Sequence, residues 1–155
     1  MTEQQPIQHT VLAVEDSDED FEAFIRALRL LDLTFPVQRT ANGDEALDYL
    51  YQTGVYAKPG SAIRPALIFM DLNLPGTDGQ EVIQEIKQND QLKSIPVIVL
   101  TTSSNPKDVE ACYRYGANSY ILKPMGIKAL ADTLQMCINY WFTLSLLPDT
   151  GESIL

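Results

Sequence analysis

The chain has 155 residues, a formal net charge of −10, and 45% hydrophobic and 21% charged residues, which fits one soluble domain with a single hydrophobic core. A nucleic-acid reader needs clustered Lys and Arg, so 11 basic residues against 21 acidic ones argue against a DNA or RNA partner. One histidine, His9, and two widely spaced cysteines, Cys112 and Cys137, exclude a histidine-based metal site, a catalytic triad and a CxxC motif.

Short apolar runs alternate with helix-spaced segments through the first half of the chain. The order is a buried strand at 11–16, a helix at 18–31, a weaker strand at 35–41, a helix from Asn42 to Gly54 and a strand at 66–72. Ser17, with Asp20 three residues later, predicts a capping box for the first helix. The connection at 52–64 is long for such a loop, and we expect either a partner contact or a tolerated insertion.

The second half continues the alternation. A helix at 79–89 is followed by a strand at 95–102, a helix at 106–117, a strand at 119–124 and a long last helix at 126–147 that ends at Pro148. Five such units predict an α/β fold: a doubly wound, flavodoxin-like, five-stranded parallel sheet with helices on both faces. We expect one domain over 10–147, polar tails at 1–9 and 148–155, and no output domain.

Polar side chains stand where the predicted strands end. Glu15 and Asp16 end the first strand and Asp71 ends the third; Thr101 and Thr102 end the fourth and Lys123 the fifth. Each has an ordinary structural explanation alone, but parallel strands gather their carboxyl ends along one edge, where ligands bind. Three carboxylates there would repel one another without a cation, and such hard oxygen ligands suit Mg²⁺.

Phosphoryl transfer to a carboxylate needs this set of groups. Asp71, alone at the end of a central strand, is the predicted nucleophile that forms an acyl phosphate. Asp16 would bind the metal, Lys123 would hold the phosphoryl charge, and Thr101 would supply a hydroxyl donor.

The same residues resemble the response-regulator receiver domain of two-component signalling. The resemblance rests on Glu15-Asp16, Asp71, Thr101, Tyr120 and Lys123-Pro124, and on the stretches VEDSDED, MDLNLPGTDGQEV and IPVIVLTT. Asp71 precedes Thr101 by thirty residues, and Thr101 precedes Lys123 by twenty-two, as is usual in that family. The match extends over about residues 10–147.

The resemblance implies that Asp71 accepts a phosphoryl group from a partner histidine kinase in the cytoplasm. Mg²⁺ would be held by Asp16, Asp71 and the backbone carbonyl of Asn73, with Glu15 reaching it through water. Beyond its own phosphorylation and slow dephosphorylation, no enzyme activity is implied.

The resemblance also implies a switch beside the phosphoacceptor. Lys123 pairs with the phosphoryl group, while the Thr101 hydroxyl moves toward it and the Tyr120 ring turns inward. Thr102 stands where a small residue is usual, so we expect it to slow entry to the site. The Lys123–Pro124 bond is expected to be cis.

The last helix carries more apolar surface than one core requires. Asp132, Gln135 and Asn139 argue against a membrane span at 129–147. The surplus predicts either a helix folded onto its own core or a twofold homodimer interface with Ile138, Trp141, Phe142 and Leu144. This extension and the long loop resemble the stand-alone, dimerising regulators paired with cyanobacterial phytochromes.

Three alternatives remain open. A Mg²⁺-dependent aspartyl phosphatase would need a second Asp as general acid two residues after the nucleophile, where this chain has Asn73. A flavodoxin-like carrier would need a phosphate-binding loop in place of the acidic EDSDED. A pseudo-receiver would keep the fold as a docking module without being phosphorylated.

Overall fold

The computed structural model describes residues 9–148 and shows five parallel strands in the order β2-β1-β3-β4-β5. The strands are β1 (Val11–Val14), β2 (Val37–Thr40), β3 (Leu67–Met70), β4 (Val97–Thr101) and β5 (Ser119–Leu122). All residues of β1, β3 and β4 are buried, whereas those of β2 and β5, at the two edges, are mostly half-buried. The continuous apolar runs in the sequence therefore mark the three inner strands.

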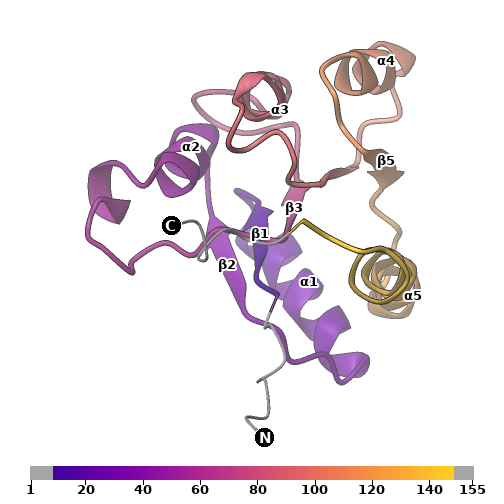
Figure 1. Ribbon diagram of the computed structural model, residues 1–155. Helices are drawn as coiled ribbons and strands as arrows, with labels where there is room; N and C mark the ends of the chain where they lie inside the picture. Colours follow the sequence, from indigo (N-terminus) through magenta and orange to yellow (C-terminus); the bar gives the residue numbers. More distant parts are fainter. Residues whose placement is uncertain (1–8, 149–155) are drawn as a thin grey trace, which may run out of the picture.

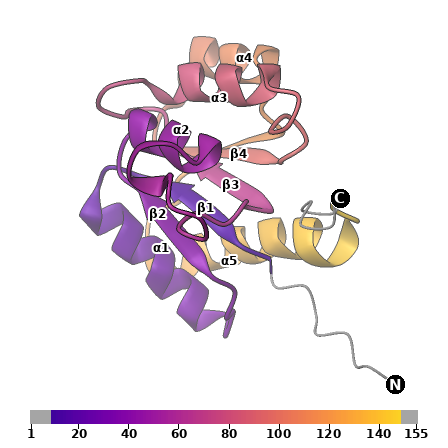
Figure 2. The same ribbon diagram turned by 60° about the vertical axis from the view of Figure 1, so that its left-hand side comes forward.

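Helices cover both faces of the sheet, as Figures 1 and 2 show. One face carries α1 (Asp18–Leu30) and α5 (Ile127–Ile138), and the other carries α2 (Gly43–Tyr51), α3 (Gly79–Gln88) and α4 (Pro106–Arg114). Two apolar clusters result, one on each face of the sheet. The predicted doubly wound α/β fold is confirmed.

The first helix begins at a polar cap that fixes the loop after β1. The Asp20 amide donates to the Ser17 hydroxyl at 3.2 Å, which is one half of the predicted capping box. The other half is wrong: the Ser17 amide donates to Glu15 at 3.3 Å, and the Asp20 carboxylate lies against Lys123. Asp20 is thus free of a capping role through its side chain.

The long connection before β3 is folded back onto α2. It contains a short 3₁₀ helix, Gly54–Tyr56, and the Tyr56 hydroxyl donates to Glu45 at 2.8 Å. The Tyr49 hydroxyl donates to the carbonyl of Ile63 at 2.7 Å and accepts from its amide at 3.1 Å. These bonds hold the segment 52–64 against α2.

The C-terminal helix is not one continuous α-helix. After α5 the backbone widens into a π-helical segment, Asn139–Leu144. This change turns the aromatic side chains back toward the body of the protein: Phe142 stacks on His9 with centroids 4.7 Å apart and meets Phe35 edge to face at 5.5 Å. His9 therefore packs against the domain, and the remaining tail residues at 1–8 and 149–155 lie outside the described residues.

Two further predictions concern the cysteines and the Lys123–Pro124 bond. Cys112 and Cys137 are free and buried, as predicted. The Lys123–Pro124 bond is trans, as are all the peptide bonds described, so the expected cis bond is wrong; trans is the intrinsically preferred isomer even before proline. Within residues 9–148, no helix is both long and apolar enough to cross a membrane.

Candidate functional site

Backbone hydrogen bonds beyond the strands fix the predicted site residues at one edge of the sheet. The Asp71 amide donates to the carbonyl of Val14 at 3.1 Å, and the Lys123 amide donates to that of Thr101 at 2.8 Å. The ladder thus extends one residue past β3 and β5. The carboxyl ends of β1, β3, β4 and β5 meet there, as the sequence predicts.

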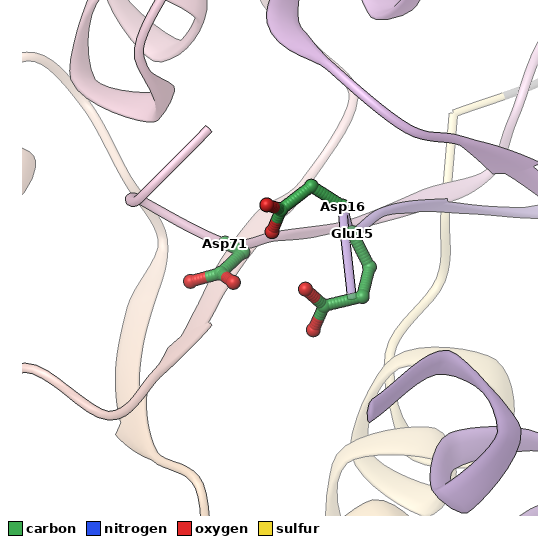
Figure 3. Close-up of side chains that lie close together, drawn as sticks. All are labelled: Glu15, Asp16 and Asp71. Carbon is green, nitrogen blue, oxygen red and sulfur yellow. The ribbon is translucent and has the colours of Figure 1, made fainter. Parts of the chain in front are cut away.

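Three carboxylates form the centre of the site. Oxygen atoms of Glu15, Asp16 and Asp71 lie within 4.8 Å of one another, and Figure 3 shows the side chains turned toward a common space. Asp71 and Glu15 are each 8% exposed, whereas Asp16 is open to solvent. The cluster is therefore anchored inside the protein but reachable from outside.

Lys123 supplies the positive charge at this cluster. Its ammonium donates to Glu15 at 2.5 Å, to Asp20 at 2.8 Å and to Asp71 at 3.3 Å. The side chain of Lys123 is only 14% exposed, so its ion pairs with Glu15 and Asp71 are shielded from water, whereas the Asp20 partner is 47% exposed. One ammonium with three N–H groups is thus shared among three carboxylates.

Burial and neighbouring charge shift the pKa values of two groups here. Burial raises the pKa of Glu15 to about 7, because the opposing hydrogen bond from Lys123 does not compensate and the Asp71 carboxylate raises the pKa further. Burial lowers the pKa of the Lys123 ammonium, but hydrogen bonds to Asp20 and Glu15 and the charge of Asp71 raise it by more. Lys123 therefore stays charged at neutral pH.

The predicted switch residues lie beside the acids. Thr101 is fully buried at the end of β4, and its hydroxyl accepts a long hydrogen bond from the Ser103 amide at 3.4 Å. Tyr120 is half-buried on β5, and its hydroxyl donates to the carbonyl of Ser103 at 2.7 Å. Both side chains thus contact the same short loop after β4.

The remaining predicted residues are on the rim. Thr102 is exposed and lines a cavity of about 190 Å³ between α1 and α5, next to Asp71. Asn73 is exposed in the turn after β3. The cavity is lined by apolar residues, among them Phe24, Phe69 and Leu130, and by the polar side chains of the site.

Arg39 is a site-supporting residue that the sequence pattern did not reveal. From β2 it donates to the backbone carbonyl of Glu15 at 3.0 Å and to Asp18 at 2.7 Å, and its guanidinium lies over the Phe21 ring. It thereby clamps the loop that carries Glu15 and Asp16. Only the position of Arg39 beside β1 in the fold shows this role.

The donor set fits a hard divalent cation. Three carboxylates offer oxygen atoms within 4.8 Å, one of them solvent-exposed, and the mutual repulsion of the acids is only partly relieved by Lys123. Cysteine and histidine are absent from this cluster. The chemistry of the residues therefore favours a metal such as Mg²⁺ or Mn²⁺ over a soft one.

Comparison with known proteins agrees with this geometry. The model of the response regulator receiver domain matches residues 11–135. The chain belongs to this family. Response regulator Rcp1 of Synechocystis sp. is 40% identical over 138 residues, which cover 89% of this chain and 92% of Rcp1.

Solved structures give the same relationship. The phosphorylated cyanobacterial phytochrome response regulator RcpA superimposes with a TM-score of 0.84 at 37% identity, covering 92% of this chain and 99% of RcpA. The Mn²⁺-bound form of Rcp1 gives a TM-score of 0.81 at 39% identity, covering 91% of this chain and 99% of that structure. The chain is thus a response regulator receiver of the Rcp1 type, with the acid cluster of a divalent-metal site.

Proposed function

We propose that Asp71 accepts a phosphoryl group from a histidine kinase, with Mg²⁺ held by Asp16, Asp71 and the backbone carbonyl of Asn73, and with Glu15 reaching it through water. The observation that carries this proposal is the arrangement around Asp71. Its buried carboxylate lies 3.3 Å from the Lys123 ammonium and within the cluster of three acids. When bound, Mg²⁺ supplies positive charge that neutralises phosphoryl oxygens.

Several side chains of the protein then take part in the phosphoryl transfer. A carboxylate oxygen of Asp71 attacks phosphorus, the bond to the leaving group breaks, and the leaving group departs with the electron pair. Asp71 is oriented by the Leu72 amide, which donates to it at 2.8 Å. Lys123 pairs with the developing charge, and Thr101, with Tyr120 on the adjacent strand, responds to the new phosphoryl oxygens.

The proposed partner is a phytochrome-type sensor kinase, because phytochrome regulators are among the most similar structures. The chain itself would catalyse only its own phosphorylation and slow dephosphorylation. Free, buried Cys112 and Cys137 agree with the reducing cytoplasm as the place of this exchange.

We also propose a homodimer formed through the C-terminal segment. Of the predicted interface residues, Ile138 is only 4% exposed, and Trp141 and Phe142 pack partly on the chain's own core. Leu144 is 77% exposed, and Met136 and Tyr140 are also largely exposed. These three apolar side chains, together with Leu146, offer the surface that a second copy would cover.

The test of the phosphoryl transfer is uptake from acetyl phosphate with and without Mg²⁺, followed on a gel that retards phosphoproteins. We expect a Mg²⁺-dependent shifted band for the wild type and none for Asp71→Asn. The matched control is Asp90→Asn, at a carboxylate that is 92% exposed and pairs with Lys93, and it should label like the wild type.

The possible failures lead to different conclusions. Full labelling of Asp71→Asn would mean that another residue accepts the phosphoryl group. A wild type that takes up no label from acetyl phosphate or from an active histidine kinase would favour the pseudo-receiver, a docking module with an intact fold.

A further inference from the structure

The Lys123 ammonium has one partner that the receiver pattern does not assign. Its three carboxylate contacts are Glu15, Asp71 and, at 2.8 Å, Asp20 on the first turn of α1. Asp20 is 103 residues away in the sequence, and its side chain is 47% exposed, so the contact bridges the mouth of the site from helix to loop.

Asp20 differs from the other two partners in one respect. Glu15 and Asp71 belong to the cluster of acids that fits a metal, whereas Asp20 lies outside it. A metal would draw on the oxygens of Glu15 and Asp71, and a phosphoryl group would occupy Asp71. Asp20 is then the one carboxylate contact of Lys123 that neither event uses.

The position of Asp20 is fixed by the backbone rather than by its own side chain. Its amide donates to the Ser17 hydroxyl at the start of α1, and the following helix packs against α5. Lys123, in contrast, has a long flexible side chain that loses much rotamer freedom when it is held. A carboxylate on a rigid helix therefore suits the task of holding that ammonium in place.

We propose that Asp20 is a positioning residue, which holds the Lys123 ammonium beside Asp71 so that it can pair with the incoming phosphoryl group. This inference rests on the proposed phosphoryl transfer to Asp71. Asp20 itself does not touch the reacting atoms. Without it, the ammonium has to be ordered during the transfer, and the transfer slows.

A general effect of charge would change the rate of phosphoryl uptake in the opposite direction, which makes the inference testable. A phosphodonor such as acetyl phosphate is an anion, so removing any acid near the mouth should speed its approach. Loss of the hold on Lys123 should instead slow the reaction. Glu19 provides the matched control, because it is an exposed acid on the same turn and is not bonded to Lys123.

The experiment measures the rate constant of phosphoryl uptake from acetyl phosphate at saturating Mg²⁺. In this step a P–O bond forms to Asp71, the P–O bond to acetate breaks, and acetate leaves with the electron pair. We expect Asp20→Asn to slow uptake by about three- to tenfold, on the scale of one charge-assisted hydrogen bond, and Glu19→Gln to leave it unchanged or slightly faster. In a Lys123→Met background, Asp20→Asn should have no further slowing effect.

A second measurement does not depend on the reaction. In Mg²⁺-free protein, the Lys123 ammonium protons should give an NMR signal protected from exchange with water, and Asp20→Asn should broaden or abolish it while Glu19→Gln keeps it. Thermal unfolding of each variant shows that the fold is retained.

The outcomes separate this inference from the function on which it rests. If the wild type labels at Asp71 but Asp20→Asn is as fast as Glu19→Gln, or still slows uptake in the Lys123→Met background, the role of Asp20 is wrong and the receiver function stands. If Asp71→Asn labels like the wild type, the proposed function itself fails.

Discussion

At Gly79, the first residue of α3, a side chain would collide with the backbone of Asp71, the proposed phosphoacceptor. An added Cβ would overlap the carbonyl oxygen of Asp71 and lie 2.8 Å from the Cα of Leu72. Gly79 lies directly against this backbone, and its amide donates to the Leu72 carbonyl at 3.1 Å. The glycine is thus required by close approach of two backbone segments, not by an unusual backbone angle.

We therefore expect Gly79→Ala to destabilise the protein by about 1–3 kcal/mol through overpacking and to slow phosphoryl uptake by displacing Asp71. Urea denaturation and the acetyl phosphate assay measure the two effects. Gly60→Ala adds the same methyl group in open space in the loop before β3; its positive φ of 81° makes alanine cost some stability there, but uptake should not change. Unchanged uptake by Gly79→Ala would show that Asp71 tolerates the shift.

Lys87 provides a pH-dependent stability effect away from the site. Burial lowers its pKa to about 8, although its ammonium donates to the carbonyls of Lys93 and Ile95. Between pH 8 and the unfolded pKa of 10.5, the folded protein then binds fewer protons at this residue than the unfolded one. The contribution of Lys87 to the free energy of unfolding accordingly rises with pH across that interval.

Lys87→Met removes this titration. The free energy of unfolding of the variant, relative to that of the wild type, should be highest below pH 8. This difference should shrink as the pH approaches 10.5. Urea midpoints of both proteins at several pH values give the difference directly. A difference that does not change with pH would show that the Lys87 ammonium is not desolvated as the structure implies.

At the scale of residues, the sequence predicted which side chains lie at the ends of the strands. It did not predict the contacts that side chains from other elements make with them. Asp71, Glu15 and Asp16 come together because a parallel sheet aligns carboxyl ends, which is a rule of the fold. Asp20 and Arg39 meet the site from α1 and β2, and no periodicity or motif encodes a long side chain reaching across two elements.

At the scale of elements, apolar periodicity predicted the type and order of the helices and strands well, because the face that each element buries sets the spacing of its apolar residues. It failed where a local backbone change re-aims side chains. The sequence 126–147 continues in helical spacing, yet the π-helical turn at Asn139–Leu144 rotates Phe142 toward Phe35 and His9. Such a turn inserts one residue into the helical repeat and leaves no mark in composition.

The same segment sets the test of the proposed homodimer. Because Trp141 and Phe142 pack on the chain's own core, truncating them would mix folding with association. Leu144→Asp places a charge on an exposed side chain and should shift the protein to monomer in light scattering after size exclusion. Leu30→Asp, at a 64% exposed leucine on α1, is the control and should leave the mass unchanged.

If Leu144→Asp has the mass of the wild type, the dimer does not use this surface. Two other exposed apolar side chains, Leu122 at the end of β5 and Met125 three residues later, would then be the next surface to test. A monomeric wild type would contradict the homodimer altogether.

At the scale of the whole molecule, the sheet lies between two apolar clusters, one on each face. The α1–α5 side carries Asp20, Lys123 and the cavity, and the α4–β5 side carries Ser103 and Tyr120. A change at Asp71, between them, is therefore in contact with both sides. This division was predictable from the fold class, whereas the cavity depends on the packing of particular rings.

The ion pairs of Lys123 join residues 108, 103 and 52 positions apart in the chain. The strands β3, β4 and β5 must all be in place beside β1 before the ammonium can meet all three acids, since β5 is the last strand in the sequence and lies at the edge away from β2. A nascent or partly assembled chain thus lacks the means to accept a phosphoryl group. The Lys123 contacts are therefore a marker of the complete sheet, because a chain that lacks β5 can form none of them.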